Sequence, residues 1–135
     1  LNNAVHQQGF SSYDRLESIR DSLEWMEDSA ASIKTELTGG TLTQAEQEEW
    51  ADSLAELWGG ALDDLWGCLE QRLDPAELEP LAAKQAAWIS WKDEQVTQAG
   101  AGPHEGCTQA AAEDMAAAEL TRDRVYELLD WLDET

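Results

Sequence analysis

The chain has 135 residues, and 29 acidic against eight basic side chains give it a formal net charge of -21. A surface this acidic repels phosphate backbones and anionic lipid headgroups, which argues against binding to nucleic acid or to a membrane surface. The charge either attracts a cationic protein partner or serves solubility alone. Hydrophobic residues make up 42% of the chain and include seven tryptophans, so we expect one folded domain that buries its indoles, not a disordered acidic tail. No apolar run approaches the roughly 18 residues of a membrane-spanning helix.

The first predicted helix carries apolar residues at alternating spacings of three and four between Leu16 and Leu37, and Gly39-Gly40 ends it. This spacing lays one apolar stripe along the helix. Residues 1–40 are therefore predicted to be an N-terminal helix that packs on, or projects from, a helical domain formed by residues 41–135. Packing is the favoured arrangement, and coiled-coil pairing with a second copy is a third option.

The second predicted helix begins where Thr43 is followed by Glu46, the spacing of a capping box, and its wide apolar face extends to Leu73. Glycine costs about 1 kcal/mol in a helix interior, so close packing, a kink or a ligand contact has to offset each glycine here. The three positions concerned are Gly59, Gly60 and Gly67. A kink at the first two is the favoured explanation.

The third predicted helix starts at Asp74-Pro75, because proline fits the first turn of a helix but not its interior. Residues 100–106 form the one obvious loop, and the last helix is expected over about residues 108–132, with a possible interruption near Thr121. No segment alternates with period two for long enough to indicate a strand. The sequence therefore predicts an all-α fold, an up-and-down antiparallel bundle of three to four long helices.

The third and fourth helices carry a polar pattern of their own. Gln85, Trp88 and Lys92 fall at positions i, i+3 and i+7, so a glutamine, an indole and a cation share one helix face, and Asp93 follows directly. The stretch L-T-x-x-R in the last helix supplies two further polar side chains, those of Thr121 and Arg124.

This pattern, a Q-x-x-W helix with a basic-acidic pair followed by L-T-x-x-R, resembles the family of lysozyme-inhibitor-like envelope proteins. The resemblance covers roughly residues 41–132 and implies a helical, non-catalytic domain. The chain departs from the family at Lys92, where arginine is usual. Since lysine lacks the bidentate fork of arginine, any contact made there is expected to be singly bonded.

Two interpretations of the motif remain open. In the first, Trp88 is a core residue, Arg124 pairs with Asp93, and Thr121 or Gln85 completes the hydrogen bonds, so that the motif is a structural clasp between the third and fourth helices. In the second, the same side chains face a ligand and form a recognition site.

The two cysteines, Cys68 and Cys107, suggest one disulfide in an exported protein. The resemblance implies a different bridge, but the corresponding positions hold Val96 and approximately Ala116, so the Cys68–Cys107 pair is a candidate substitute. Two thiols are the second option. A metal site that also uses His104 is the weakest, because it lacks a fourth ligand and any C-x-x-C spacing.

Sequence signatures of catalysis are missing from the chain. It contains no G-x-S-x-G, no phosphate loop ending in G-K-S or G-K-T, no H-E-x-x-H and no D-x-D-x-D-G calcium loop. The sequence therefore predicts a protein that is not an enzyme and that uses neither a cofactor nor a metal.

Two functions follow as hypotheses. The resemblance implies an inhibitor of a cationic protein such as lysozyme, with the loop residues Pro103, His104 and Glu105 as a candidate insert into the target's active-site cleft. The alternative is a scaffolding module on the cell surface, whose first helix docks on a partner. Both place the protein outside the cell or in the cell envelope, with any lipid anchor on a segment not present here, and both leave its oligomeric state open.

Overall fold

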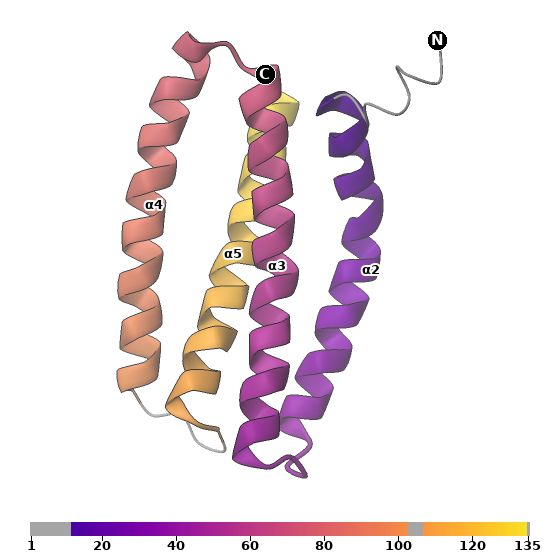
Figure 1. Cartoon of the computed structure of the whole chain (residues 1–135), viewed down its shortest axis with the longest axis vertical. Coiled ribbons are helices and arrows are strands. Elements are labelled where there is room, and N and C mark those ends of the chain that lie inside the picture. Colours follow the sequence, from indigo (N-terminus) through magenta and orange to yellow (C-terminus); the bar gives the residue numbers. More distant parts are fainter. Residues whose placement is uncertain (1–11, 103–106, 135) are drawn as a thin grey trace.

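The computed structural model describes residues 12–102 and 107–134, and it is an antiparallel bundle of four helices (Figure 1). The helices are α2 (Ser12–Thr38), α3 (Gln44–Arg72), α4 (Pro75–Ala101) and α5 (Gln109–Glu134). The predicted all-α, up-and-down fold is confirmed, and no strand occurs in the described residues. The interruption expected near Thr121 is wrong, because α5 continues through that residue.

Residues next to each helix start determine where α3 and α4 begin. Before α3, the backbone N–H of Glu46 donates to Thr43 Oγ1 at 3.1 Å, and the Glu46 carboxylate accepts from the Thr43 N–H at 2.9 Å. Asp74 and Glu77 make the same reciprocal pair before α4. Each box satisfies backbone donors that a helix start leaves without a partner. Both boundaries therefore follow from residues that are neighbours in the sequence.

The three helices α2, α3 and α5 form the compact part of the molecule. Helix α3 packs against both α2 and α5, whereas α4 packs mainly against α5. Figure 1 shows α3 in front of α5, with α2 and α4 on either side. Within the described residues, α4 contributes a single buried residue to the main core, Leu81. The bundle is therefore open on the side between α3 and α4. The largest fully buried side chains are those of Trp58, Leu54, Leu65, Leu69, Leu128 and Val125.

Burial of the tryptophans differs from the sequence-based expectation. Trp58 is the one indole that is fully buried, at 1% exposure, whereas Trp25 on α2 is 62% exposed and Trp91 on α4 is also exposed. Aliphatic side chains fill most of the remaining interior of the bundle. Trp50 on α3 is exposed as well, at 37%. The expectation that all seven are buried is wrong.

The predicted disulfide between Cys68 and Cys107 is also wrong. Cys68 is buried in the main core, whereas Cys107 packs in a second cluster with Ala51 and Ala111. The rise of an α-helix places residues 51 and 68 roughly 25 Å apart along α3, far beyond the reach of a disulfide. The same separation prevents the two thiols from sharing a metal ion.

The glycines of α3 are not explained by close packing. A Cβ atom added at Gly59, Gly60 or Gly67 would meet nothing within 4 Å. We therefore expect Gly60→Ala and Gly67→Ala each to raise the free energy of unfolding by about 0.5–1 kcal/mol, because alanine loses less backbone entropy in a helix. Urea denaturation followed by circular dichroism measures the gain.

Gly40 provides the control for these substitutions. Its φ of +75° lies in the left-handed region, which a side chain disfavours. Gly40→Ala should therefore lower the stability by about 1 kcal/mol. If Gly60→Ala and Gly67→Ala also lowered the stability, the open space around these glycines would not determine whether a substitution stabilises or destabilises the protein.

Candidate functional site

The sequence motif joins α4 to α5. Arg124 Nε donates a hydrogen bond to Gln85 Oε1 at 2.9 Å. The centroid of the Trp88 ring lies 5.7 Å from Arg124 Cζ and 5.5 Å from Lys92 Nζ. Two cations therefore hold the same indole through cation–π contacts, one from its own helix and one from α5. Burial lowers the pKa of Arg124, an effect that Glu127 opposes.

Two details of the expected clasp are wrong. Asp93 is largely exposed, and its Oδ1 lies 3.9 Å from Nζ of the neighbouring Lys92. Arg124 Nη1 instead lies 3.8 Å from Glu127 Oε2, and no ion pair joins Arg124 to Asp93. Trp88 is half-buried and not a core residue. Successive helix positions are about 100° apart, so Asp93 cannot share the face of Lys92 that meets α5.

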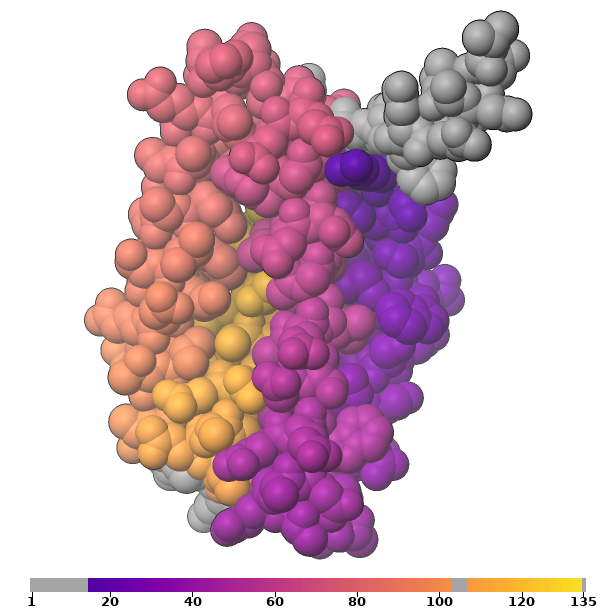
Figure 2. Space-filling model, viewed as in Figure 1, coloured from indigo at the N-terminus to yellow at the C-terminus, as the bar shows by residue number. Residues whose placement is uncertain are grey.

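The motif lines a groove of about 370 Å³. In Figure 2, this side of the molecule is hollowed between α3 and α4, with α5 visible behind them. α4 provides one wall, α3 provides the other, and Thr121 of α5 lies between them. The lining residues are Gly59, Leu62, Asp63, Trp66, Gln85, Trp88, Ile89, Lys92 and Thr121. Four residues of the sequence motif therefore face one groove.

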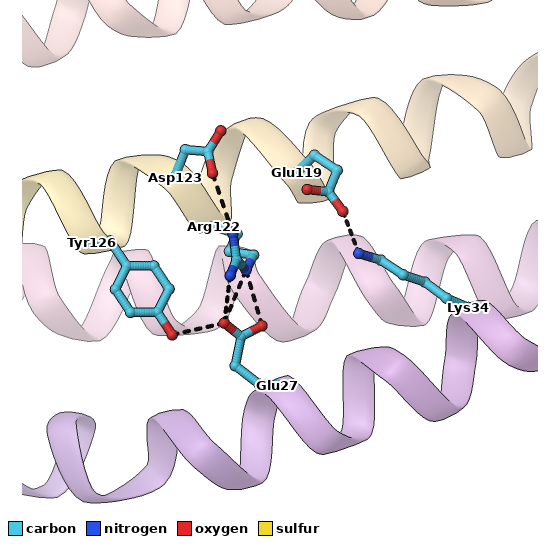
Figure 3. Close-up of polar contacts among 6 residues, drawn as sticks. All are labelled: Glu27, Lys34, Glu119, Arg122, Asp123 and Tyr126. Carbon is cyan, nitrogen blue, oxygen red and sulfur yellow. Dashed lines mark hydrogen bonds and ion pairs between the residues drawn. The ribbon is translucent and has the colours of Figure 1, made fainter.

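A second polar cluster, which the sequence-based reasoning missed, connects α2 to α5 (Figure 3). Arg122 Nη2 and Nε donate to the Glu27 carboxylate at distances from 2.7 to 3.0 Å, and Tyr126 Oη donates to the same carboxylate at 2.8 Å. The hydrogen bonds from Arg122 lower the pKa of Glu27, and burial opposes that shift. Burial and the bond to Glu27 raise the pKa of Tyr126.

A regular spacing in the sequence could have revealed this connection. Arg20, Glu27 and Lys34 lie seven residues apart on α2, and each forms an ion pair with α5. A seven-residue repeat keeps side chains on one side of a helix, so these three face the same neighbour. Their partners are Asp133, Arg122 and Glu119 respectively.

Acidic side chains cluster near the starts of α3 and α5. Burial raises the pKa of Asp114, and the nearby carboxylates of Asp52, Glu113, Glu48 and Glu56 raise it further. This is a locally repulsive, strongly negative region.

In residues 12–102 and 107–134, no group of three His, Cys, Asp or Glu side chains is arranged to hold a metal ion. The candidate loop residues Pro103, His104 and Glu105 lie outside the described residues, as does the proposed metal ligand His104.

Comparison with known proteins identifies the family. The model of the family described as lysozyme inhibitor LprI matches residues 29–128, a range that begins within α2 and ends within α5. The chain therefore belongs to the lysozyme inhibitor LprI family. No curated protein and no solved structure matches the chain. Among the described helices, none has the length and apolar character needed to cross a membrane.

Proposed function

We propose that this member of the family is a non-catalytic, acidic helical protein that binds and inhibits a basic lysozyme-type enzyme in the cell envelope or the secreted space. The observation that carries the proposal is the family match, which extends over the last part of α2, all of α3 and α4 and most of α5. The four-helix structure provides a rigid body on which an interaction surface can be held.

The charge of the chain supports a cationic target. Most described basic side chains are already paired with carboxylates of the same molecule: Arg20, Lys34, Lys92, Arg122 and Arg124. Acidic groups remain in large excess on the surface. Such an excess accelerates encounter with a basic enzyme at low salt and weakens with ionic strength.

The direct test is lysis of bacterial cell walls by a basic lysozyme in the presence of the purified protein. We expect lysis to fall as the protein approaches and exceeds the enzyme concentration, with weaker inhibition at physiological than at low salt. Poly-L-glutamate of matched charge is the control, because it reproduces the attraction without the fold. Undiminished lysis at excess protein at both salt concentrations would rule out the inhibitor function.

The same assay tests whether the loop between α4 and α5 contacts the target enzyme. The double variant His104→Ala, Glu105→Ala should weaken inhibition if the loop between α4 and α5 enters the active site of the target. The helix bundle should be unaffected, which a circular dichroism spectrum checks. Full inhibition by the double variant would remove the loop from the proposal while leaving the inhibitor function intact.

A scaffolding role is the second candidate, and exposed Trp25 is the observation that favours it. Its indole is 62% exposed and lines a groove between α2 and α3 with Met26 and Leu57, and aromatic side chains are enriched at protein interfaces. Deleting residues 1–40 cannot test the idea, since Leu16, Ile19 and Met26 belong to the main core. Trp25→Ala is the suitable variant. Loss of partner capture with unchanged lysozyme inhibition would favour scaffolding.

A further inference from the structure

We propose that the groove between α3, α4 and α5 binds a short, uncharged saccharide. This inference goes beyond lysozyme inhibition and does not depend on it. The groove volume of about 370 Å³ lies in the range of small-molecule sites. Four observations on the groove, namely its polar groups, its indoles, its rim charges and its glycine, point to this class of ligand.

The first observation is unused hydrogen-bonding capacity at two nearly buried residues. Thr121 is 5% and Gln85 8% exposed. Gln85 Oε1 accepts from Arg124, but no described residue accepts a hydrogen bond from Gln85 Nε2 or from the Thr121 hydroxyl. No fully buried polar side-chain atom in the described part of the chain lacks a partner. These two groups therefore keep some accessible surface, and both residues line the groove.

Such groups select a ligand that is polar as well as apolar. A purely apolar molecule would leave the Thr121 hydroxyl and the Gln85 amide without partners, which costs free energy. A sugar ring has hydroxyl groups around its edge and C–H groups on its faces. It can satisfy both groups while its C–H face packs against the apolar walls formed by Leu62, Ile89 and the indoles.

The second observation concerns the indoles of the groove. Trp88, on the α4 wall, disfavours a cationic ligand. Trp88 already carries Lys92 and Arg124 within 6 Å of its ring centroid. A further cation there would be repelled. Trp66, on the opposite wall, is half-buried, and no described cation lies over its ring. Trp66 is therefore the available platform for the face of a sugar ring.

The rim charges are the third observation. Asp63 and Lys92 line the groove from opposite walls, so one acid and one base oppose each other at an otherwise strongly negative surface. Both can hydrogen-bond to hydroxyl groups. A polyanionic ligand is disfavoured by the net charge of the whole chain, and a neutral polyhydroxylated ligand is not.

Gly59 is the fourth observation. It lines the groove, and a Cβ atom there would meet open space. The helix cost of this glycine, about 1 kcal/mol, is thus not offset by packing, and its missing side chain leaves the groove open. Close packing, a kink or a ligand contact can each explain a glycine at this position, and the open space excludes close packing.

Titration with N,N′,N″-triacetylchitotriose, followed by NMR of the indole N–H groups of the full chain, tests the proposal. We expect saturable shifts at Trp66 and Trp88 with a weak dissociation constant, on the order of 1 mM, and smaller shifts at the exposed Trp25 and Trp91. Maltotriose serves as a second neutral sugar. The proposal holds if either sugar shifts the groove indoles, and it is overturned if neither does.

Two matched substitutions locate the site. Gly59→Met should fill the groove and weaken binding at least tenfold. Gly60→Met places the same side chain one residue away, in the separate groove between α2 and α3, and should leave binding unchanged. Thr121→Val removes the hydroxyl at nearly constant shape and should weaken binding about five- to tenfold. Equal effects of the two methionine variants would overturn the assignment.

Two further outcomes decide between ligands. A preference for the cationic trimer of glucosamine over the acetylated one would overturn the proposal, because charge attraction to the acidic surface would explain it. Loss of lysozyme inhibition in Gly59→Met, without any chitotriose shift in the unmodified protein, would make the groove a protein contact and would also overturn it. Failure of lysozyme inhibition alone leaves the NMR result unaffected, so the two proposals fail separately.

Discussion

Replacing Trp58 with alanine is expected to lower the free energy of unfolding by about 3–5 kcal/mol, the range for truncating a buried aromatic side chain. Trp58 is fully buried at the centre of α3. Its ring lies 6.3 Å from that of Tyr126 on α5, with Arg122 over its face at 6.0 Å. The substitution leaves a cavity in the three-helix core. Urea denaturation followed by far-UV circular dichroism measures the loss.

Two companion variants make the Trp58 result interpretable. Trp58→Phe should cost less than Trp58→Ala, which keeps the test readable if the alanine variant retains little of the ordinary 5–15 kcal/mol of domain stability. Trp25→Ala removes an exposed indole and should change the stability by less than about 0.5 kcal/mol. Similar losses at positions 25 and 58 would contradict the assignment of the core to α2, α3 and α5.

The second large effect is expected at the contact between Glu27 and Arg122. Arg122→Met should lower the free energy of unfolding by about 1–2 kcal/mol at pH 7, because Glu27 keeps only the hydrogen bond from Tyr126. The estimate is modest since Glu27 and Arg122 both remain 34% exposed and solvent screens their charges. Chemical denaturation of both proteins in the same buffer gives the difference.

The same contact predicts a pH dependence. The pKa of Glu27 is lowered in the folded state, so its stabilising contribution is present above the unfolded value near 4.5 and is lost as the pH falls through the folded pKa. The stability difference between the unmodified protein and Glu27→Gln should therefore shrink as the pH falls from 7 to below 4. Glu119→Gln, at an exposed pair with Lys34, should change little at pH 7. A difference for Glu27→Gln that stays constant with pH would refute the contact.

Features that neighbouring residues decide could be predicted from the sequence. The capping residues Thr43 and Asp74 are found at the expected starts of α3 and α4. The apolar stripe predicted between Leu16 and Leu37 is the buried face of α2. Both features depend on spacings of three and four residues along one helix, which the order of residues contains directly.

Contacts between helices were predicted less well. Arg124 hydrogen-bonds to Gln85, whereas the sequence-based prediction paired it with Asp93 and left Thr121 or Gln85 to complete the hydrogen bonds. The predicted disulfide joined thiols at opposite ends of the bundle. A sequence gives the face on which a side chain lies relative to its own helix. It does not give the rotation and height of the next helix, which decide which side chains meet.

The amino-acid order alone determined the helical fold, the helix starts, the excess of negative charge and the family to which the chain belongs. Only the tertiary structure decided that α4 packs mainly on α5, that Trp58 alone among the indoles is fully buried, and that Gln85, Trp88, Lys92 and Thr121 line one groove with Trp66. The physical reason is the range of the interactions: capping and helix periodicity act within a few residues, whereas a groove exists only where separate helices fail to close against each other.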